Sequence, residues 1–565
     1  MGEKQTETIQ WHTDALKIDF LVNNTGVICL DRILPITVEP SPHSSPNFES
    51  SKLALVSIRM SGEGSGEIKT AKTLIGPTLS DRLRYQSHRI IKSDDGSNET
   101  LIVECDFKDS IYLAAGGPML SSHDWKKRLS SGQSFTTVPI ACCRVQGDEQ
   151  AAFAAIIDYR RQIRRPHNDM ERMPIIFNDY MNCFMGDPDE NKVCALLEPV
   201  GQLGAEYFVI DTGWYADDGN WWDDVGLWEP STKRFPSGFM KLMGEIRNKG
   251  LIPSLWLEPE VVAVRSPVGS QLPNEAFFQE DGHRVVEKRR WTLDYRHLEV
   301  IVWMNKVMHN LVDQYGAECF KFDYNSDVLQ GTDVDGQGTA GAAHFEHQRA
   351  YLGWLRALLD NYPGVVIETC SGGANRLDYA MLAVHSIHCT SNQQDPKLYA
   401  AIAAACPTAV TPEQSASWAY PQLGCSDKLN ALSLVNSMMG RVDLLSDNRL
   451  AIVKEGLEVY KSMRGDLRHA HPTSPLGLPK WHDDWVALAL TSADSKTTYL
   501  AVWRRDGPTE MTISLGKGLR TDKDSRVSVL HPTRFTTQVE LAGADSTVCL
   551  QLLDEPCACI LKVER

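Results

Sequence analysis

The pattern that most constrains this chain is an alternation of short apolar strands with helical segments, which begins near residue 174. The apolar runs are PIIFN (174–178), YFVID (207–211), IPSLWLE (252–258), ECFKFDYN (318–325), VVIETC (365–370) and HSIHCTS (385–391). Helical segments such as NKVCALLEPVGQLG and HFEHQRAYLGWLRALLDNY lie between them. Strands that alternate with helices form βαβ units and a parallel sheet. The pattern therefore predicts a (β/α)8 barrel, or TIM barrel, over residues 170–480.

The segments on either side of this region have a different pattern. Residues 1–165 contain short strand-like runs, among them KLALVSIRM and TLIVECDF, separated by turn signals such as GEGSG and SDDGSN. We expect a β-sandwich there, followed by a charged linker, RQIRRPHNDMERM. Residues 482–565 return to strands such as WVALALTS and TYLAVWRR, which predict an antiparallel β domain. The expected fold class is multi-domain α/β, with a TIM barrel between two β domains.

Charge and cysteine spacing exclude several classes of function. The chain has 57 Lys and Arg against 73 Asp and Glu, a net charge of −16, which disfavours binding to nucleic acid or anionic lipid. No run of ~18 apolar residues could span a membrane, and the N-terminus lacks a signal-peptide pattern, so we expect a cytoplasmic protein. None of the 14 cysteines forms a C-x-x-C pair, and we predict no metal and no cofactor. Nothing in the sequence excludes a homo-oligomer.

Polar and aromatic residues recur where the predicted barrel strands end, which is where the chemistry of such barrels is located. They are Tyr180, Asp211, Trp256 with Glu258, Lys321 with Asp323 and Asn325, Cys370, and Asn392 with Asp395. The spacing of Lys321, Asp323 and Asn325 places all three on one face of a strand. A buried Lys–Asp pair that only stabilises the barrel is one interpretation. The polar groups on neighbouring strand ends favour a functional site instead.

At these residues the chain resembles glycoside hydrolase family 36, the α-galactosidase-like retaining enzymes, over residues ~174–480. EYFVIDTGWY and IPSLWLEPE are similar to two of its strand-end motifs, and FKFDYN resembles its Lys-Trp-Asp-Met-Asn nucleophile strand. IETCSGG looks like its Cys-x-x-Gly-Gly segment, and TSNQQD stands where the family has Thr-Ser-Asp-Asn-Thr-Asp.

The resemblance implies a role for each residue. Asp323 would be the nucleophile, and a carboxylate beside the Lys321 cation suits this role because it stays ionised. The substrate-binding residues would be Tyr180 and Trp256 as walls against the sugar ring, Asp211 as a hydroxyl acceptor, Arg289, Lys321, Asn325, and Cys370 and Gly373 near the 2-substituent. Arg290 is the alternative to Arg289, because the register is open at that point.

Three departures from the family pattern bear on function. Thr212 stands where the family has a second acid, and Ala374 and Asn375 replace glycines. Asn392 occupies the position of the general acid/base, and an amide does not deliver a proton at neutral pH. The explanations are an engineered isosteric change, a natural variant that uses another acid such as Asp378 or Asp395, or a degenerate binding protein.

The function expected from the resemblance is that of a retaining exo-α-glycosidase. It would hydrolyse terminal α-galactosides by double displacement through a glycosyl–Asp323 intermediate, with Asn392 at the acid/base position. Its partner would be an oligosaccharide or glycoside substrate. The alternatives are an α-N-acetylgalactosaminidase, a transglycosidase of the same family, and, from another class, a non-catalytic sugar-binding protein.

Overall fold

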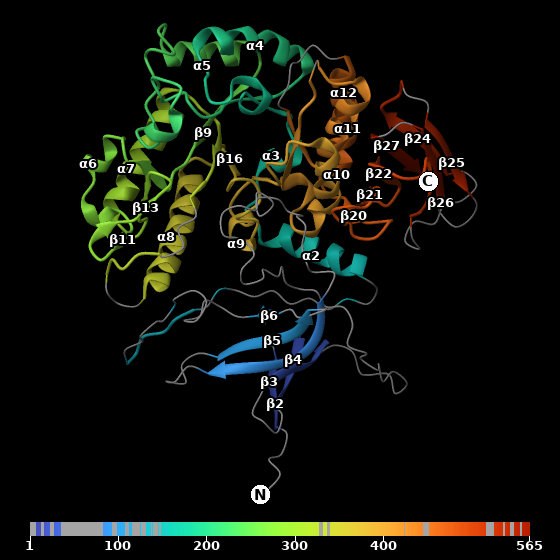
Figure 1. Cartoon of the computed structure of the whole chain (residues 1–565), viewed down its shortest axis with the longest axis horizontal. Coiled ribbons are helices and arrows are strands. Elements are labelled where there is room, and N and C mark those ends of the chain that lie inside the picture. The colour runs from blue at the N-terminus through green and yellow to red at the C-terminus, as the bar shows by residue number, and fades with distance from the viewer. Residues whose placement is uncertain are drawn as a thin grey trace, which may run out of the picture. The chain divides into compact units, whose positions relative to one another are not determined.

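The computed structural model places the chain in two compact units (Figure 1), which we describe separately. It describes residues 150–326, 331–335, 339–422, 424–442, 451–515, 525–534, 538–542, 547–553 and 556–565, together with the strands and isolated positions of the N-terminal part. The smaller unit holds most of the first 152 residues. The larger unit holds the remainder of the chain, apart from two short exchanged segments.

The smaller unit contains two antiparallel sheets of three strands each. The first pairs β1 (Glu7–His12), β2 (Leu16–Val22) and β3 (Ile28–Pro35), and the second pairs β4 (Leu83–Lys92), β5 (Glu99–Phe107) and β6 (Tyr112–Ala115). The predicted strand TLIVECDF lies within β5, whereas KLALVSIRM lies outside the described residues. Residues 149–163, expected at the end of this β region, form helix α2 (Glu149–Ile163) instead. Its sequence, EQAAFAAIIDYRRQI, is rich in alanine, the strongest helix former.

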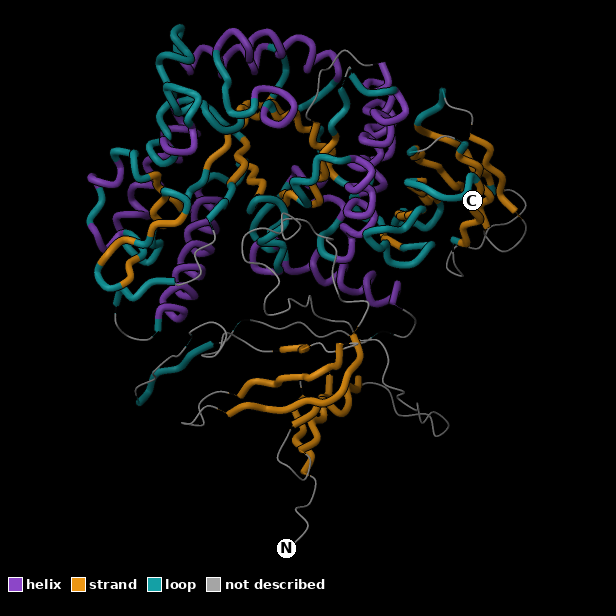
Figure 2. Tube along the Cα trace, viewed as in Figure 1, coloured by secondary structure: helices purple, strands orange, loops and turns teal. Residues whose placement is uncertain are grey.

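The larger unit is built on a closed barrel of eight parallel strands, which confirms the TIM-barrel prediction. Figure 2 shows these strands as a ring. The strands, in chain order, are β7 (Ile176–Asn178), β8 (Tyr207–Ile210), β9 (Ile252–Leu257), β15 (Cys319–Phe322), β16 (Val366–Thr369), β17 (Ile387–Cys389), β18 (Ser415–Ala419) and β19 (Arg441–Leu444). β19 pairs with β7 and closes the ring. All strand carboxyl ends therefore meet at one end of the barrel.

Each barrel strand is followed by a helix that precedes the next barrel strand (Figure 1). They are α4 (Glu190–Leu203), α5 (Phe239–Asn248), α7 (Leu298–His309), α8 (Ala340–Asn361), α9 (Tyr379–Leu382), α10 (Pro396–Ala405), α11 (Asp427–Met438) and α12 (Ala451–Leu467). Helix α4 begins where the Asp189 carboxylate accepts the Lys192 N–H, and it ends at Gly204, whose φ is +86°. Such caps fix both helix ends, and the apolar stripe of Val193 and Leu197 is buried.

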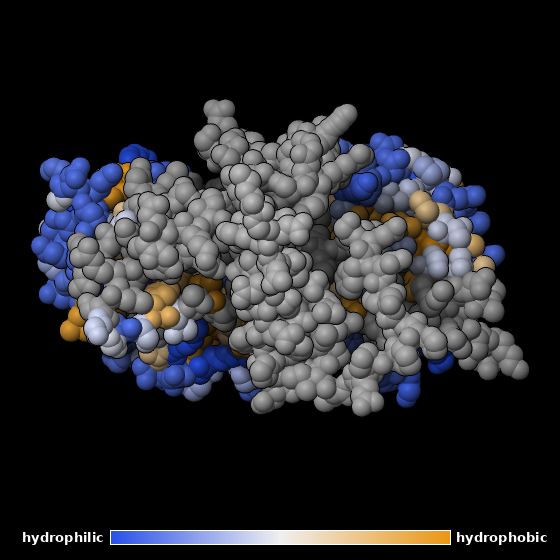
Figure 3. All heavy atoms as spheres, turned by 90° about the horizontal axis from the view of Figure 1, so that it is seen from below, coloured by the Kyte–Doolittle hydropathy of each residue, from blue (hydrophilic) through white to orange (hydrophobic). Residues whose placement is uncertain are grey.

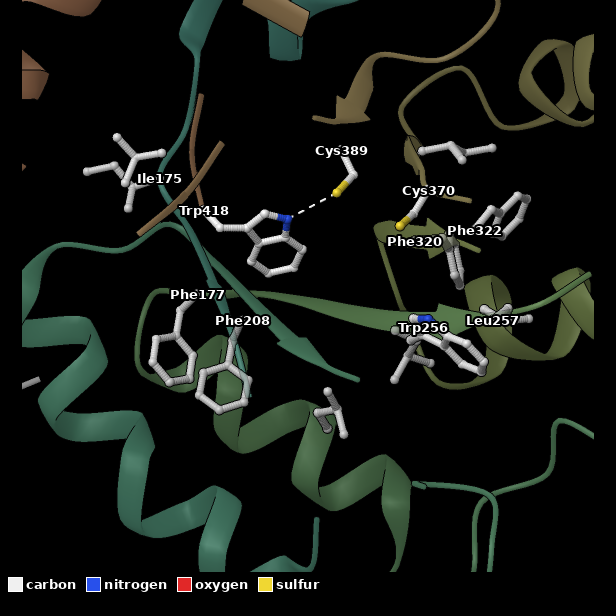
Figure 4. Packing of buried hydrophobic residues seen from close by; sticks show 14 of the residues in the cluster. Ile175, Phe177, Phe208, Trp256, Leu257, Phe320, Phe322, Cys370, Cys389 and Trp418 are labelled. Atoms are coloured by element: carbon white, nitrogen blue, oxygen red, sulfur yellow. Dashed lines mark hydrogen bonds between the residues drawn. The ribbon is translucent and has the colours of Figure 1, made fainter. Parts of the chain in front are cut away.

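The interior of the barrel is divided into an apolar part and a polar part. Ile176, Tyr207, Val209, Cys319, Val366, Ile387 and Ala416 form a buried cluster in the lumen. Larger apolar side chains on the outer side of the strands, such as Phe177 and Phe208, pack among the surrounding helices (Figure 4). On the face shown in Figure 3, hydrophilic side chains gather on the described outer flanks. The lumen cluster is a packed core, so a ligand has access only from an end of the barrel.

A long excursion separates β9 from α7. It contains β10 (Val261–Ala263), α6 (Val268–Gln271), β11 (Gln279–Glu280), β12 (His283–Arg284), β13 (Val286–Glu287) and β14 (Arg290–Thr292). β10, β14 and β13 form a small antiparallel sheet. Because this segment follows the carboxyl end of β9, it carries Arg289 and Arg290 on the same side of the barrel as the predicted site.

The C-terminal part consists of two antiparallel sheets, as the sequence predicted. One has the order β20 (His471–Thr473), β21 (Trp485–Thr491), β22 (Thr497–Arg504), β27 (Cys557–Glu564) and β24 (Arg526–His531), and the other has the order β23 (Glu510–Ser514), β26 (Thr547–Leu552) and β25 (Thr537–Ala542). Side chains of both sheets share one hydrophobic cluster. The first strand begins at His471, eleven residues before the predicted boundary at 482.

Candidate active site

The predicted site residues lie on or just beyond the carboxyl ends of the barrel strands. Tyr180 follows β7, Asp211 follows β8, Trp256 belongs to β9, Lys321 belongs to β15 with Asp323 and Asn325 after it, Cys370 and Gly373 follow β16, and Asn392 follows β17. In a parallel barrel these ends face a common opening. The sequence therefore places residues that are up to 212 positions apart at one end of the molecule, and their contacts decide which of them form a cluster.

The centre of the cluster is a buried ion pair between Lys321 and Asp211. The Lys321 Nζ lies 3.0 Å from Asp211 Oδ2, and the two side chains are 7% and 3% exposed. Asn178 also donates to Asp211 Oδ2 at 2.7 Å, and the Thr212 backbone N–H donates to Oδ1 at 2.8 Å. Burial alone would lower the pKa of Lys321, but the negative charge of Asp211 outweighs it and holds this pKa well above its usual range. Lys321 is therefore a permanent cation.

The Asp323 carboxylate receives hydrogen bonds on both oxygens. The backbone N–H groups of Tyr324 and Gly372 donate to Oδ1 at 2.9 and 3.2 Å, and Trp256 Nε1 donates to Oδ2 at 3.4 Å. Burial would raise the pKa of Asp323, but the Lys321 cation, the Asn325 side chain and these backbone N–H groups hold it below its usual value. Asp323 is therefore an ionised carboxylate in a site shielded from water.

Glycine is required in the turn that brings Gly372 to Asp323. Gly372 and Gly373 have φ angles of +52° and +106°, both in the region that disfavours side chains. This turn directs the Gly372 N–H to Asp323, and it lets the Gly373 N–H donate to Cys370 Sγ at 3.4 Å. The Cys-x-x-Gly-Gly segment of the sequence thus supplies one of the hydrogen bonds to the carboxylate.

Aromatic rings surround the carboxylate. Trp256 is 1% exposed; Tyr215 stacks on it at 6.3 Å between ring centroids, and Trp221 meets it edge-on at 5.8 Å. Tyr180 meets Trp221 edge-on at 6.1 Å. Trp418 lies on the other side of the lumen from Trp256 (Figure 4). The Lys321 Nζ is 4.5 Å from the Trp418 ring centroid. Such rings suit the C–H faces of a sugar.

Asn392 lies beside sulfur rather than beside a charge. Its side-chain oxygen accepts from Cys389 Sγ at 3.8 Å, and Cys389 Sγ in turn accepts from Trp418 Nε1 at 3.0 Å, the bond drawn in Figure 4. Asn392 is half-buried. A chain of weak hydrogen bonds therefore connects the amide to the ring that faces Lys321.

The two arginines of KRRW occupy different environments. Arg289 is 63% exposed, and its guanidinium lies 2.9 Å from Asp223 Oδ2. Arg290 is buried, pairs with Glu258, and lies over the Trp222 ring at 3.5 Å. Glu258 also accepts the Asn325 backbone N–H at 2.7 Å. Arg290 is thus linked to the cluster through Glu258, whereas Arg289 is paired away from it.

The two alternative acids cap helices. Asp378 is the N-cap of α9 and accepts the Ala380 and Met381 N–H groups at 2.9 and 3.0 Å. Asp395 is the N-cap of α10 and accepts the Lys397 and Leu398 N–H groups at 2.8 and 3.3 Å. Each carboxylate therefore has a structural role that accounts for its position in the sequence.

Sequence reasoning left out three buried residues of the cluster: Asp179, Glu368 and Trp418. Asp179 accepts the Asp211 N–H at 2.8 Å, and burial raises its pKa well above the usual range. Glu368 stands two residues before Cys370, so the alternation along a strand was a usable signal for it. Trp418 lies in β18, a strand that the sequence analysis did not identify.

Two further observations concern other kinds of site. A cavity of about 760 Å³ lies at the opposite, amino-terminal end of the barrel strands, lined by residues that include His167, Tyr207 and Val366. The active sites of such barrels lie at the carboxyl ends of the strands, so this cavity is not the candidate active site. Among the described residues, no group of three or more His, Cys, Asp or Glu could hold a metal ion. Within the same residues, no helix is long and apolar enough to cross a membrane.

Comparisons with known proteins identify a common domain. The family model described as Melibiase matches residues 147–417. The α-galactosidase Mel36A of Lactobacillus acidophilus is 26% identical over 292 residues, which are 50% of this chain and 38% of that protein. The matched region therefore spans well under half of that relative.

Solved structures share the fold. The GH36 α-galactosidase AgaA of Geobacillus stearothermophilus, in complex with 1-deoxygalactonojirimycin, superposes with a TM-score of 0.69 at 18% identity, over 82% of this chain and 66% of that chain. Variants of AgaA have been solved with stachyose and with raffinose. The α-galactosidase of Lactobacillus brevis superposes with a TM-score of 0.66 at 14% identity, over 100% of this chain and 98% of that one.

Proposed function

Because this chain is a GH36 α-galactosidase-like protein, we propose that it is a retaining exo-α-glycosidase that acts on terminal α-galactosides. The observation that carries this proposal is the Asp323 carboxylate. It is ionised and held by Tyr324, Gly372 and Trp256, at the carboxyl end of a barrel. A sugar-binding protein has no need of a buried, anchored carboxylate beside a permanent cation, whereas a nucleophile needs both.

In the proposed reaction Asp323 attacks the anomeric carbon. The sugar ring lies against Trp256 and Tyr180, and its anomeric carbon comes within roughly 3–3.5 Å of an Asp323 oxygen. Asp211 and Lys321 bind sugar hydroxyls, since their pairing fixes both an acceptor and a donor. The bond to the leaving group breaks, a glycosyl–Asp323 ester forms, and a second displacement returns the original anomeric configuration.

Asn392 restricts the substrates of this reaction. We assign it to the position opposite Asp323, where a carboxylic acid would protonate the leaving oxygen. An amide does not supply this proton, so the leaving group departs with the electron pair and as an anion. Substrates whose aglycone is a weak base, such as a nitrophenolate, need no protonation. The proposed activity is therefore strongest on α-galactosides with acidic aglycones.

A panel of 4-nitrophenyl α-glycosides tests the proposal, with the galactoside, N-acetylgalactosaminide and glucoside measured side by side. The galactoside should be cleaved fastest, with release of α-galactose as the first product. Asp323→Ala is the matched control and should be inactive on every member. Binding of galactosides without turnover of any member, in both the wild type and Asn392→Asp, would assign the chain to sugar binding instead. A cytoplasmic location stays a prediction.

A further inference from the structure

Glu368 is a buried acid of the barrel lumen for which the proposed reaction gives no role. It lies in β16, where it pairs in register with Lys321 of β15. Val366, Glu368 and Cys370 alternate along this strand and therefore share its inner face. Val366 belongs to the lumen cluster, and Cys370 lies at the candidate site. Glu368 is 2% exposed and thus lies one layer below the site residues at the strand ends.

The charged groups that face Glu368 come from three other strands. Lys321 and Asp323 belong to β15 and its end, Asp211 follows β8, and Arg441 belongs to β19. The Cys319 thiol of β15 is a fifth titratable neighbour, but burial raises its pKa and keeps it neutral. The Arg441 guanidinium is matched by Asp169, which it contacts at 2.5 and 3.3 Å. Burial also keeps Asp179, the fourth carboxyl group near Lys321, protonated. Among the described side chains, the Lys321 ammonium is therefore left to balance Asp211, Asp323 and Glu368.

The hydrogen bonds decide which of these carboxyl groups is neutral. Asp211 contacts the ammonium directly, and Asp323 accepts three N–H donors. In contrast, Glu368 Oε1 is buried and has no hydrogen-bond partner within the described part of the chain. An ionised Glu368 would compete with Asp211 for the Lys321 ammonium and leave one buried negative charge unpaired, which is costly. Burial, together with the charges of Asp211 and Asp323, raises its pKa to about 7 against the opposing effect of Lys321.

We propose that Glu368 is a positioning residue: as a neutral acid it leaves the Lys321 ammonium on Asp211, and when ionised it draws this ammonium away. The consequence for catalysis rests on the proposed function. Loss of the Lys321–Asp211 contact removes the charged donor to the Asp211 carboxylate, which we assign to a sugar hydroxyl. Only the Asn178 and Thr212 N–H groups then hold this carboxylate, and substrate binding weakens. Ionisation of Glu368 therefore raises KM, while Asp323 keeps its own hydrogen bonds to backbone.

The first test needs no substrate and compares thermal stability across pH. The pKa of Glu368 rises from 4.5 in the unfolded chain to about 7 in the fold. The native state then binds the extra proton, so stability declines as pH rises from about 4.5 through 7. Glu368→Gln should match the wild type at pH 4.5 and exceed its Tm by at least about 2 °C at pH 8.5. A Tm difference that does not change with pH would overturn the proposal.

Two further variants serve as a replicate and as a control for this test. Glu368→Met also lacks the charge and should show the same pH dependence, so the test survives if the glutamine variant folds poorly. Glu413→Gln is the matched control, because Glu413 is equally buried but paired with Arg161 and Arg164 at 2.9 and 2.6 Å. Its loss removes a matched charge and should lower Tm at pH 8.5. A Tm gain in Glu413→Gln would mean that the effect is not specific to Glu368.

The second test measures KM for 4-nitrophenyl α-galactoside between pH 6 and 8.5. The wild-type KM should rise by about tenfold, with a smaller change in kcat, and the Glu368→Gln KM should change by less than about twofold. A parallel rise in both proteins would overturn the role of Glu368. If neither protein turns over the substrate while the Tm result holds, the proposed function fails and the neutral state of Glu368 stands.

Discussion

Lys321 and Asp211 join two barrel strands that are not neighbours. Lys321 belongs to β15 and Asp211 follows β8, with β9 between them, and their 3.0 Å contact bridges the end of β9. This pair fixes the charge state of the site, because the same ammonium holds down the pKa of Asp323. One lysine therefore pairs with the proposed binding carboxylate, Asp211, and stabilises the ionised form of the proposed nucleophile, Asp323.

Lys321→Met should therefore impair stability and activity together. Removal of one partner leaves Asp211 as an unpaired buried charge, which costs about 3–5 kcal/mol of unfolding free energy. The pKa of Asp323 should rise, so the acid limb of the kcat/KM profile moves to higher pH. Urea unfolding and a pH profile measure the two effects. Lys192→Met is the control: its pair with Asp187 is exposed and should contribute less than about 1 kcal/mol. Equal losses in both variants would contradict the central role of the pair.

The two adjacent arginines should respond differently to substitution. Arg290→Met leaves Glu258 buried without its partner and should lower the unfolding free energy by about 3–5 kcal/mol. Arg289→Met removes the exposed partner of a buried carboxylate, Asp223, which keeps the hydrogen bond from Asn220 at 2.8 Å, and should cost about 1 kcal/mol. Denaturant unfolding measures both values. A large rise in KM for Arg289→Met at unchanged stability would show that Arg289 moves to contact the substrate.

Much of this architecture could be predicted from the sequence, because buried parallel strands are visible in it as apolar runs. Six of the eight barrel strands were identified in this way. The two others, SASWA in β18 and RVDL in β19, are short and carry polar residues at alternate positions, so they lack the apolar signal. Helix α2 was not predicted because its mixed sequence lies next to strand-like runs.

The location of the candidate site could be predicted from the polar and aromatic residues at the strand ends. The contacts between these side chains could not be predicted, because they depend on the three-dimensional geometry. The alternation of residues placed Lys321 and Asp323 together. It did not reveal that Asp211 would be the partner of Lys321, because that contact joins two strands that are not paired with each other. The choice between Arg289 and Arg290 depends on a turn with positive φ at Lys288 and Arg289, which the sequence KRRW does not specify.

Asp378→Asn and Asp395→Asn should leave activity nearly unchanged. Both residues are N-caps, and asparagine is as good an N-cap as aspartate, so helices α9 and α10 keep their first turns. Steady-state kinetics on 4-nitrophenyl α-galactoside, with Tm as a check on folding, measure the outcome. A folded variant that loses activity by about 10²-fold or more would identify its aspartate as the general acid, and Asn392 would then have another role.

Azide should accelerate the wild-type protein. Hydrolysis of the glycosyl–Asp323 ester is slow, because no base activates the attacking water molecule. Azide is already an anion and needs no base, so it can attack the ester from the side that Asn392 occupies. The product should be α-galactosyl azide, with the anomeric configuration of the substrate, and NMR distinguishes it from the β-anomer. Asn392→Asp is the control, because a carboxylate at this position repels azide and activates water. A β-azide would show that no covalent intermediate forms.

Asn392→Asp should increase activity most where the leaving group is poorest. A positioned general acid contributes ~10²–10⁴-fold, and a terminal α-galactoside with a sugar aglycone needs all of it. A nitrophenolate leaves without a proton, so the glycosylation step on nitrophenyl α-galactoside should gain much less. A plot of log kcat/KM against the pKa of the leaving group should therefore be steep for the wild type and flatter for Asn392→Asp. Equal slopes in the two proteins would mean that position 392 does not face the leaving group. Asp323→Ala made in the Asn392→Asp background should be inactive on every substrate, because the new acid cannot replace the nucleophile.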